Sequence, residues 1–162
     1  RAVGPGPVGG GPVEVVATTS IIADAVTQVG REHVVVTTLI PVGEDPHTYL
    51  APPDAGERLA AAHLVLFNGL HLEGKMTQLL EENRGGVRAV AVTHRLGEAQ
   101  LRKVEGGDDA HDPHVWFDVR LWKTAAEVVR DELVRVDPAR GDAYTANAAK
   151  YLAELAALDA PV

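Results

Sequence analysis

Short apolar runs alternate with segments of helical periodicity, and this alternation restricts the fold more than any other feature of the sequence. Four runs rich in apolar and β-branched residues predict strands, at residues 13–17, 34–40, 63–67 and 87–92. The continuous run at 34–40 is typical of a strand that is covered on both faces. Because helical segments separate the runs, we expect right-handed crossovers between parallel strands. The sequence therefore predicts an α/β fold, a four-stranded parallel sheet flanked by helices.

The helical segments carry recognisable start signals. Ser20 is a candidate N-cap for the first helix, and Asp54 stands where it can cap the second. A third helix is predicted at residues 75–83. After an irregular polar stretch, two longer amphipathic patterns predict helices at 121–136 and 144–158.

Residues 1–12 differ in composition from the rest of the chain. They are rich in glycine and proline, so we expect a flexible leader, with order beginning at Val13. The chain of 162 residues is long enough for one domain with a sizeable core. No apolar run approaches the roughly 20 residues that a membrane-spanning helix needs.

The charge and the cysteine content exclude several classes of function. With 15 basic and 23 acidic residues the formal net charge is −8, which argues against a nucleic-acid partner and mildly favours cations. The chain has no cysteine, which excludes disulfides, thiolate zinc sites and cysteine nucleophiles. Any transition-metal site must therefore use histidine, carboxylate and water.

The tripeptide Asp-Pro-His occurs twice, ending at His47 and at His114. Proline fixes its own φ and favours extended geometry in the residue before it, so each copy is a stiff turn that presents an imidazole. His47 follows the second predicted strand and His114 lies beyond the fourth. Because ligands of parallel sheets gather outside the carboxyl ends of the strands, both histidines can meet at one edge. Two readings stay open: a metal site shared by the two imidazoles, or a pair of ordinary turns with idle histidines.

Other polar residues are weaker candidates. His71 falls at the same predicted edge, either as a third ligand or as a residue that lines the cleft. His111 with Asp108 and Asp109 forms either an auxiliary cation site or a solvated acidic loop.

Three residues after His114 have structural interpretations. Trp116 and Phe117 are expected to be core residues that hold the His114 loop in place. Asp118 either caps the helix that follows or accepts a hydrogen bond from a ligand imidazole, and the cap is the favoured reading.

Four motifs in order resemble one known family. They are VATTSIIAD at 16–24, PVGEDPHTY at 41–49, NGLHLE at 68–73 and DPHVWFD at 112–118. Together they resemble the TroA-like group, the metal-binding solute-binding proteins of bacterial ABC transporters for zinc and manganese. The resemblance extends from about Val13 to the end of the chain.

The resemblance implies a specific architecture and site. Proteins of this group have two α/β lobes joined by one long helix, with the metal between the lobes. The implied organisation is a leader at 1–12, an amino-terminal lobe at 13–138 and the start of the linking helix at 139–162. His47 and His114 match the first two metal ligands of the group, and the remaining ligands belong to a second lobe that the sequence lacks.

The implied function is capture of Zn²⁺ or Mn²⁺ outside the cytoplasm, in the periplasm or at the cell surface, and delivery to the membrane permease of an ABC importer. On this reading the chain is not an enzyme. The alternatives are a fragment of a metal-dependent hydrolase and a cell-surface adhesin. With half of the ligand set, the isolated lobe is expected to bind metal weakly and to form metal-linked dimers in some molecules.

Overall fold

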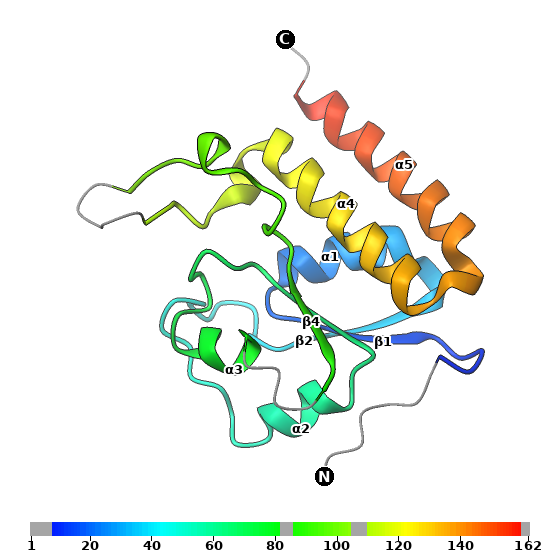
Figure 1. The fold of residues 1–162 in the computed structure, drawn as a ribbon, viewed down its shortest axis with the longest axis horizontal. Coiled ribbons are helices and arrows are strands. Elements are labelled where there is room, and N and C mark those ends of the chain that lie inside the picture. Colours follow the sequence, from blue (N-terminus) through cyan, green and yellow to red (C-terminus); the bar gives the residue numbers. More distant parts are fainter. Residues whose placement is uncertain (1–7, 82–85, 105–109, 160–162) are drawn as a thin grey trace.

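The computed structural model describes residues 8–81, 86–104 and 110–159, and it contains the predicted sheet (Figure 1). The strands are β1 (Val13–Ala17), β2 (Val34–Thr38), β3 (Leu64–Phe67) and β4 (Arg88–Ala91). They lie in the order β2-β1-β3-β4, and each neighbouring pair is parallel. The predicted four-stranded parallel sheet is confirmed.

Helices cover both faces of this sheet. They are α1 (Ser20–Gly30), α2 (Ala55–Ala60), α3 (Thr77–Glu81), α4 (Val119–Val136) and α5 (Gly141–Leu158). Helices α1, α4 and α5 pack on one face, and α2 and α3 pack on the other (Figure 1). Within the described ranges, no helix is both long and apolar enough to cross a membrane.

The central strand β1 shows why the sheet is buried on both sides. Val13 and Val15 belong to the core formed with α1, α4 and α5, whereas Val16 belongs to the core formed with α2 and α3. Successive side chains of a strand point to opposite faces, so a strand between two helical layers needs apolar residues at every position that meets a helix.

Strand β2 does not have the coverage that its sequence predicts. It lies at an edge of the sheet, ends at Thr38 and leaves Val35 45% exposed, so the expectation of a strand covered on both faces is wrong. Leu39 and Ile40 are buried but lie outside the strand. Because both residues are apolar, the predicted strand extended to residue 40, but Leu39 and Ile40 begin the loop that carries His47.

Two predicted helix starts need correction, and one predicted capping hydrogen bond does not form. The N-cap of α1 is Thr19, which has an extended backbone and accepts a hydrogen bond from the Ile22 amide at 3.4 Å, so the prediction of Ser20 is wrong. Asp54 precedes α2, but its side chain makes no capping hydrogen bond. The predicted helix 75–83 begins as a 3-10 turn and becomes α3 only at Thr77, and its last two residues fall outside the described ranges.

Helix α5 packs back onto the lobe along much of its length. Tyr144, Ala148 and Leu155 are buried in the core shared with α1 and α4. Two side-chain hydrogen bonds add to this contact: the Asn147 amide donates to the Val29 carbonyl, and the Trp122 indole donates to the Tyr151 hydroxyl, each at 3.0 Å.

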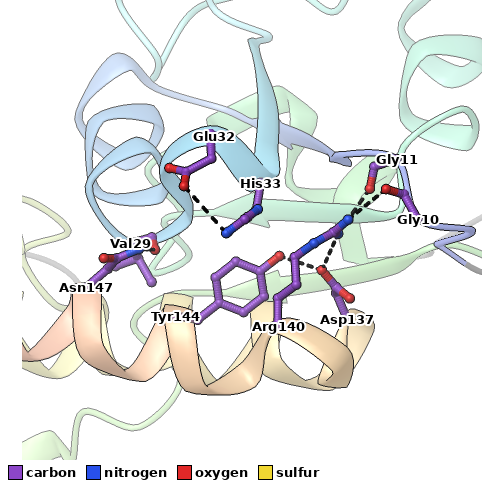
Figure 2. A network of polar contacts seen from close by, with 9 residues as sticks. All are labelled: Gly10, Gly11, Val29, Glu32, His33, Asp137, Arg140, Tyr144 and Asn147. Carbon is purple, nitrogen blue, oxygen red and sulfur yellow. Dashed lines mark hydrogen bonds and ion pairs between the residues drawn. The ribbon is translucent and has the colours of Figure 1, made fainter.

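A polar network lies at the amino end of the sheet, where the strands begin (Figure 2). The Arg140 guanidinium donates to the carbonyls of Gly10 and Gly11, at 2.7 and 3.0 Å, and to the Asp137 carboxylate at 2.8 Å. Asp137 also accepts a 2.6 Å hydrogen bond from the Tyr144 hydroxyl. The part of the glycine-rich stretch next to β1 is therefore attached to the start of α5.

Candidate metal centre

The two Asp-Pro-His loops meet over the carboxyl edge of the sheet. The loop after β2 carries His47, and the stretch beyond β4 carries His114, so the loops approach from opposite sides of the sheet. The Nε2 atoms of the two imidazoles are 3.2 Å apart, and the ring centroids are 5.2 Å apart. The structure thus brings together the two histidines that the sequence analysis singled out.

The repeated tripeptide forms the same local structure in both places. The Oδ1 atom of Asp45 accepts a hydrogen bond from the His47 amide at 2.9 Å, and that of Asp112 accepts one from the His114 amide at 3.0 Å. Aspartate favours such turns because its short side chain reaches the backbone amide two residues on. Each aspartate therefore fixes the backbone that presents the following imidazole.

Asp112 makes a second contact that also fixes the His114 ring. Its Oδ1 atom lies 2.6 Å from Nδ1 of His114. Hydrogen bonds from the His114 amide and then from its ring lower the pKa of the Asp112 carboxyl, so the group is ionised at neutral pH and can only accept. Nδ1 of His114 therefore carries the proton, and in the neutral ring Nε2 presents a lone pair toward His47.

The geometry of the imidazole pair fits a transition-metal ion. Two nitrogens of a tetrahedral zinc site, each about 2.0–2.1 Å from the metal, are about 3.3 Å apart. The separation of 3.2 Å between the two Nε2 atoms is close to this value. Among the described residues, no group of three His, Asp or Glu side chains is placed to hold a metal ion, so the structure brings together only these two candidate ligands.

Aromatic residues border the site on the His114 side. The Trp116 ring packs edge-on against the His114 ring, with centroids 5.2 Å apart. Phe117 is 81% exposed, so the prediction that it is a core residue is wrong. The short 3-10 turn at Val115–Phe117 buries Val115 instead. A hollow of about 260 Å³ lies beside His114 and Phe117.

The weaker candidates have different outcomes. His71 is exposed in the loop after β3, with φ at 60°, and forms no described metal-binding group with the imidazole pair. Asp118 caps α4 by accepting a hydrogen bond from the Arg120 amide at 2.9 Å, which confirms the favoured reading. Asp108 and Asp109, the proposed partners of His111, lie outside the described residues.

Comparison with known proteins places the chain in a family. Residues 15–162 match the family described as zinc-uptake complex component A, periplasmic. The chain belongs to this family.

The names of two relatives that resemble the chain describe metal-binding proteins. The chain is 38% identical to the manganese-binding lipoprotein MntA of Bacillus subtilis over 147 residues, which are 91% of the chain and 48% of MntA. It is 38% identical to the zinc-binding protein TroA of Treponema pallidum over 148 residues, 91% of the chain and 47% of TroA. A solved structure of the periplasmic TroA superposes with a TM-score of 0.86 at 37% identity, covering 92% of this chain and 53% of that one. The chain spans about half the length of the relatives that it matches.

Sequence patterns gave no sign of the contacts that support the two Asp-Pro-His loops. The prediction from sequence was incomplete in two respects. It treated Asp112 as a turn former, although a carboxylate that bonds the amide two residues on is also near that residue's ring. It gave no role to Asn68 or Glu73, both buried below the two loops. Asn68 donates to the carbonyl of Pro113, at 3.0 Å, and so contacts the second Asp-Pro-His copy. No periodicity or spacing signals such contacts, because they depend on the tertiary fold.

Proposed function

We propose that the chain is the metal-capturing amino-terminal lobe of an extracytoplasmic receptor that delivers zinc or manganese to an ABC importer. His47 and His114 supply two of the metal ligands through their Nε2 atoms. The observation that carries the proposal is the 3.2 Å separation of these atoms, produced by two copies of one tripeptide. Membership of the zinc-uptake family and the names of the zinc-binding and manganese-binding relatives support the same cargo.

The rest of the receptor follows from the same reasoning. The remaining ligands come from a second lobe, which corresponds to the half of the relatives' length that the chain does not span. Residues 13–138 form the amino-terminal lobe, and residues 139–162 begin the helix that leads to the second one. The partner is the membrane permease of the importer, and the site releases its cargo to it unchanged.

A hydrolytic function is less well supported. Metal-dependent hydrolysis needs a resident ion with an open position and a base beside the bound water. The names of similar proteins describe metal binding and transport, and both imidazoles lie at an edge where a second lobe can cover them. No contact among the residues that the structure describes favours the adhesin alternative.

A lobe with two imidazoles has predictable metal selectivity. Two ligands impose little geometry, so affinity should follow the general order in which copper and then zinc bind more tightly than manganese. Discrimination between zinc and manganese in the complete receptor therefore depends on the ligands of the second lobe. Two copies of the lobe that share one ion would supply four imidazoles, so zinc should produce a metal-linked dimer of the isolated lobe.

Calorimetric titration with ZnCl₂ tests the proposal on the wild type, His47→Ala, His114→Ala and His71→Asn. We expect either alanine variant to weaken zinc binding at least about tenfold, since each removes one of two ligands. His71→Asn is the matched control, because His71 is an exposed histidine of the same edge and asparagine tolerates its positive φ. Zinc binding that survives in both alanine variants would contradict the proposal.

Protons compete with metal for a neutral imidazole nitrogen, so pH provides a second test. Zinc affinity of the wild type should be weaker at about pH 5.5 than at about pH 7.5. An affinity that does not change over this range would point to a site made of carboxylates alone. Sedimentation with and without zinc, in the wild type and in His47→Ala, tests the metal-linked dimer.

A further inference from the structure

A buried carboxylate lies below the edge that carries the two imidazoles. Glu73 is 1% exposed, and its described hydrogen-bond donors are neutral. Its Oε1 accepts from the Thr18 hydroxyl at 2.8 Å and from the Asn68 amide at 2.5 Å, and its Oε2 accepts from the Gly69 amide at 3.2 Å. Burial of a carboxylate is costly unless hydrogen bonds compensate, so these contacts hold Glu73 in a defined place. Thr18 follows β1 and Asn68 follows β3, so Glu73 connects the carboxyl ends of the two central strands.

One branch of this arrangement reaches His114. The Asn68 backbone is held on both sides, because its amide donates to Glu73 and its carbonyl accepts from the Thr93 hydroxyl at 2.6 Å. The Asn68 side chain then donates to the carbonyl of Pro113 at 3.0 Å. Pro113 immediately precedes His114, so Asn68 helps to hold the second Asp-Pro-His turn in place.

The other branch reaches His47. Gly74 follows Glu73 directly and packs its backbone against the His47 carbonyl, so closely that a Cβ on Gly74 would lie 2.1 Å from that oxygen. The φ of Gly74 is 44°, which also favours glycine. The first Asp-Pro-His turn therefore rests on the residue next to Glu73.

The segment between the two branches is strained. Leu70 and His71 have φ values of 54° and 60°, which side chains with a Cβ rarely adopt. Such a conformation persists only where the surrounding contacts impose it. Gly69 precedes this segment and Glu73 follows it. The hydrogen bond from the Gly69 amide to the Glu73 carboxylate therefore joins the two ends of the loop.

We infer that Glu73 is a positioning residue for the imidazole pair: it contacts neither histidine, but it fixes the segment from Asn68 to Gly74 on which both Asp-Pro-His turns rest. The inference depends on the proposed function, because it assigns Glu73 a role in the same metal site. In this arrangement the separation of the two Nε2 atoms depends on Glu73 and the segment that it holds, as well as on the two Asp-Pro-His turns.

The test compares Glu73→Gln with Glu132→Gln in the complete 162-residue chain. The single NH₂ group of glutamine at position 73 must face either the Asn68 amide or the Gly69 amide, which also donates, so one hydrogen bond is lost and the loop must shift. Glu132 is the matched control, because it is also a buried carboxylate, 3% exposed, but pairs with Arg88 at the start of β4. We expect Glu73→Gln to weaken zinc binding about tenfold, the usual effect of losing an outer-shell partner of a metal ligand. Glu132→Gln should stay within about twofold of the wild type even where it lowers the melting temperature.

A spectroscopic measurement separates positioning from general destabilisation. The visible absorption of bound Co²⁺ reports the geometry of its ligands, so Glu73→Gln should change the spectrum and Glu132→Gln should not. If Glu73→Gln does not fold, Thr18→Val decides instead, because it removes one donor to Glu73 and keeps the shape of the side chain. Thr18→Val should then weaken zinc binding and change the cobalt spectrum in the same sense.

The outcomes distinguish this inference from the proposed function. If the wild type binds zinc through the two histidines but the position-73 variant (or Thr18→Val in its place) matches Glu132→Gln in affinity and spectrum, the positioning role is wrong and the proposed function stands. If His47→Ala and His114→Ala bind zinc as the wild type does, the proposed function is wrong and the inference falls with it.

Discussion

The two ends of the sheet hold polar groups in opposite ways. At the amino end, Arg140, Asp137 and Tyr144 bond to one another and to backbone carbonyls, so the donors of the network find acceptors within the lobe (Figure 2). At the carboxyl end, His47 and His114 direct their Nε2 atoms at each other from an exposed edge. The amino end is closed and stabilises the fold, whereas the carboxyl end leaves ligand atoms that a metal ion can use.

An aspartate also has a different role at each end of the sheet. Asp137 is 4% exposed, and the Arg140 guanidinium and the Tyr144 hydroxyl point at its carboxylate. Asp112 is a third exposed and supports the ring of a candidate ligand. Replacing the first should therefore change the stability of the lobe, and replacing the second should change its metal affinity.

The largest effect is expected from Asp137→Ala. It leaves the buried Tyr144 hydroxyl without its acceptor and removes an ionised partner of Arg140. Hydrogen bonds to charged groups contribute about 1.5–3 kcal/mol each, so we expect the free energy of unfolding to fall by about 2–3 kcal/mol. Urea denaturation measures this loss, and the zinc affinity of the folded variant should equal that of the wild type. A variant that loses zinc affinity as well would show that the two ends are coupled.

A smaller effect is expected from Asp112→Ala, measured against Asp45→Ala. Both variants lose the hydrogen bond to the amide of the following histidine, but only Asp112 has a described contact with its ring. We expect Asp112→Ala to weaken zinc binding about tenfold, or about 1.4 kcal/mol, and Asp45→Ala to weaken it less. Equal losses in calorimetric titration would mean that the turns matter and the ring contact does not.

The smallest effect concerns the pH dependence of Asp137. Burial raises the pKa of this carboxyl, but hydrogen bonds from Tyr144 and Arg140 outweigh burial and lower it overall. A lowered pKa stabilises the folded state above the unfolded value of about 3.9, and the contribution disappears as the pH falls through the folded value. The gap in unfolding free energy between the wild type and Asp137→Asn, about 1 kcal/mol, should stay constant from about pH 7 to 5 and shrink below. A gap that widens in acid would contradict the assigned direction.

Much of the fold was predictable because the buried strands are rich in apolar and β-branched residues. The runs that became β1, β3 and β4 were located to within one residue at each end, although β4 lies at an edge of the sheet. Leu39 and Ile40 misled the prediction for β2, because an apolar side chain signals burial and not strand geometry. The prediction for Phe117 failed because an aromatic side chain does not guarantee burial: the turn after His114 directs this ring to solvent.

The site was predictable only as far as its repeated motif. The two Asp-Pro-His copies pointed to His47 and His114, and parallel topology explained how they meet. The difference between Asp112 and Asp45 was not visible, because identical tripeptides carry no information about side-chain rotamers. The contacts of Glu73 with residues after β1 and β3 exist only once the sheet has formed.

A structure of the lobe with bound zinc tests the central claim most directly. We expect one ion in the gap between His47 and His114, about 2.0–2.1 Å from the Nε2 atom of each, with Nδ1 of His114 still bonded to Asp112. A zinc ion held elsewhere, by a single histidine or by the acidic residues Asp108 and Asp109, would contradict the account.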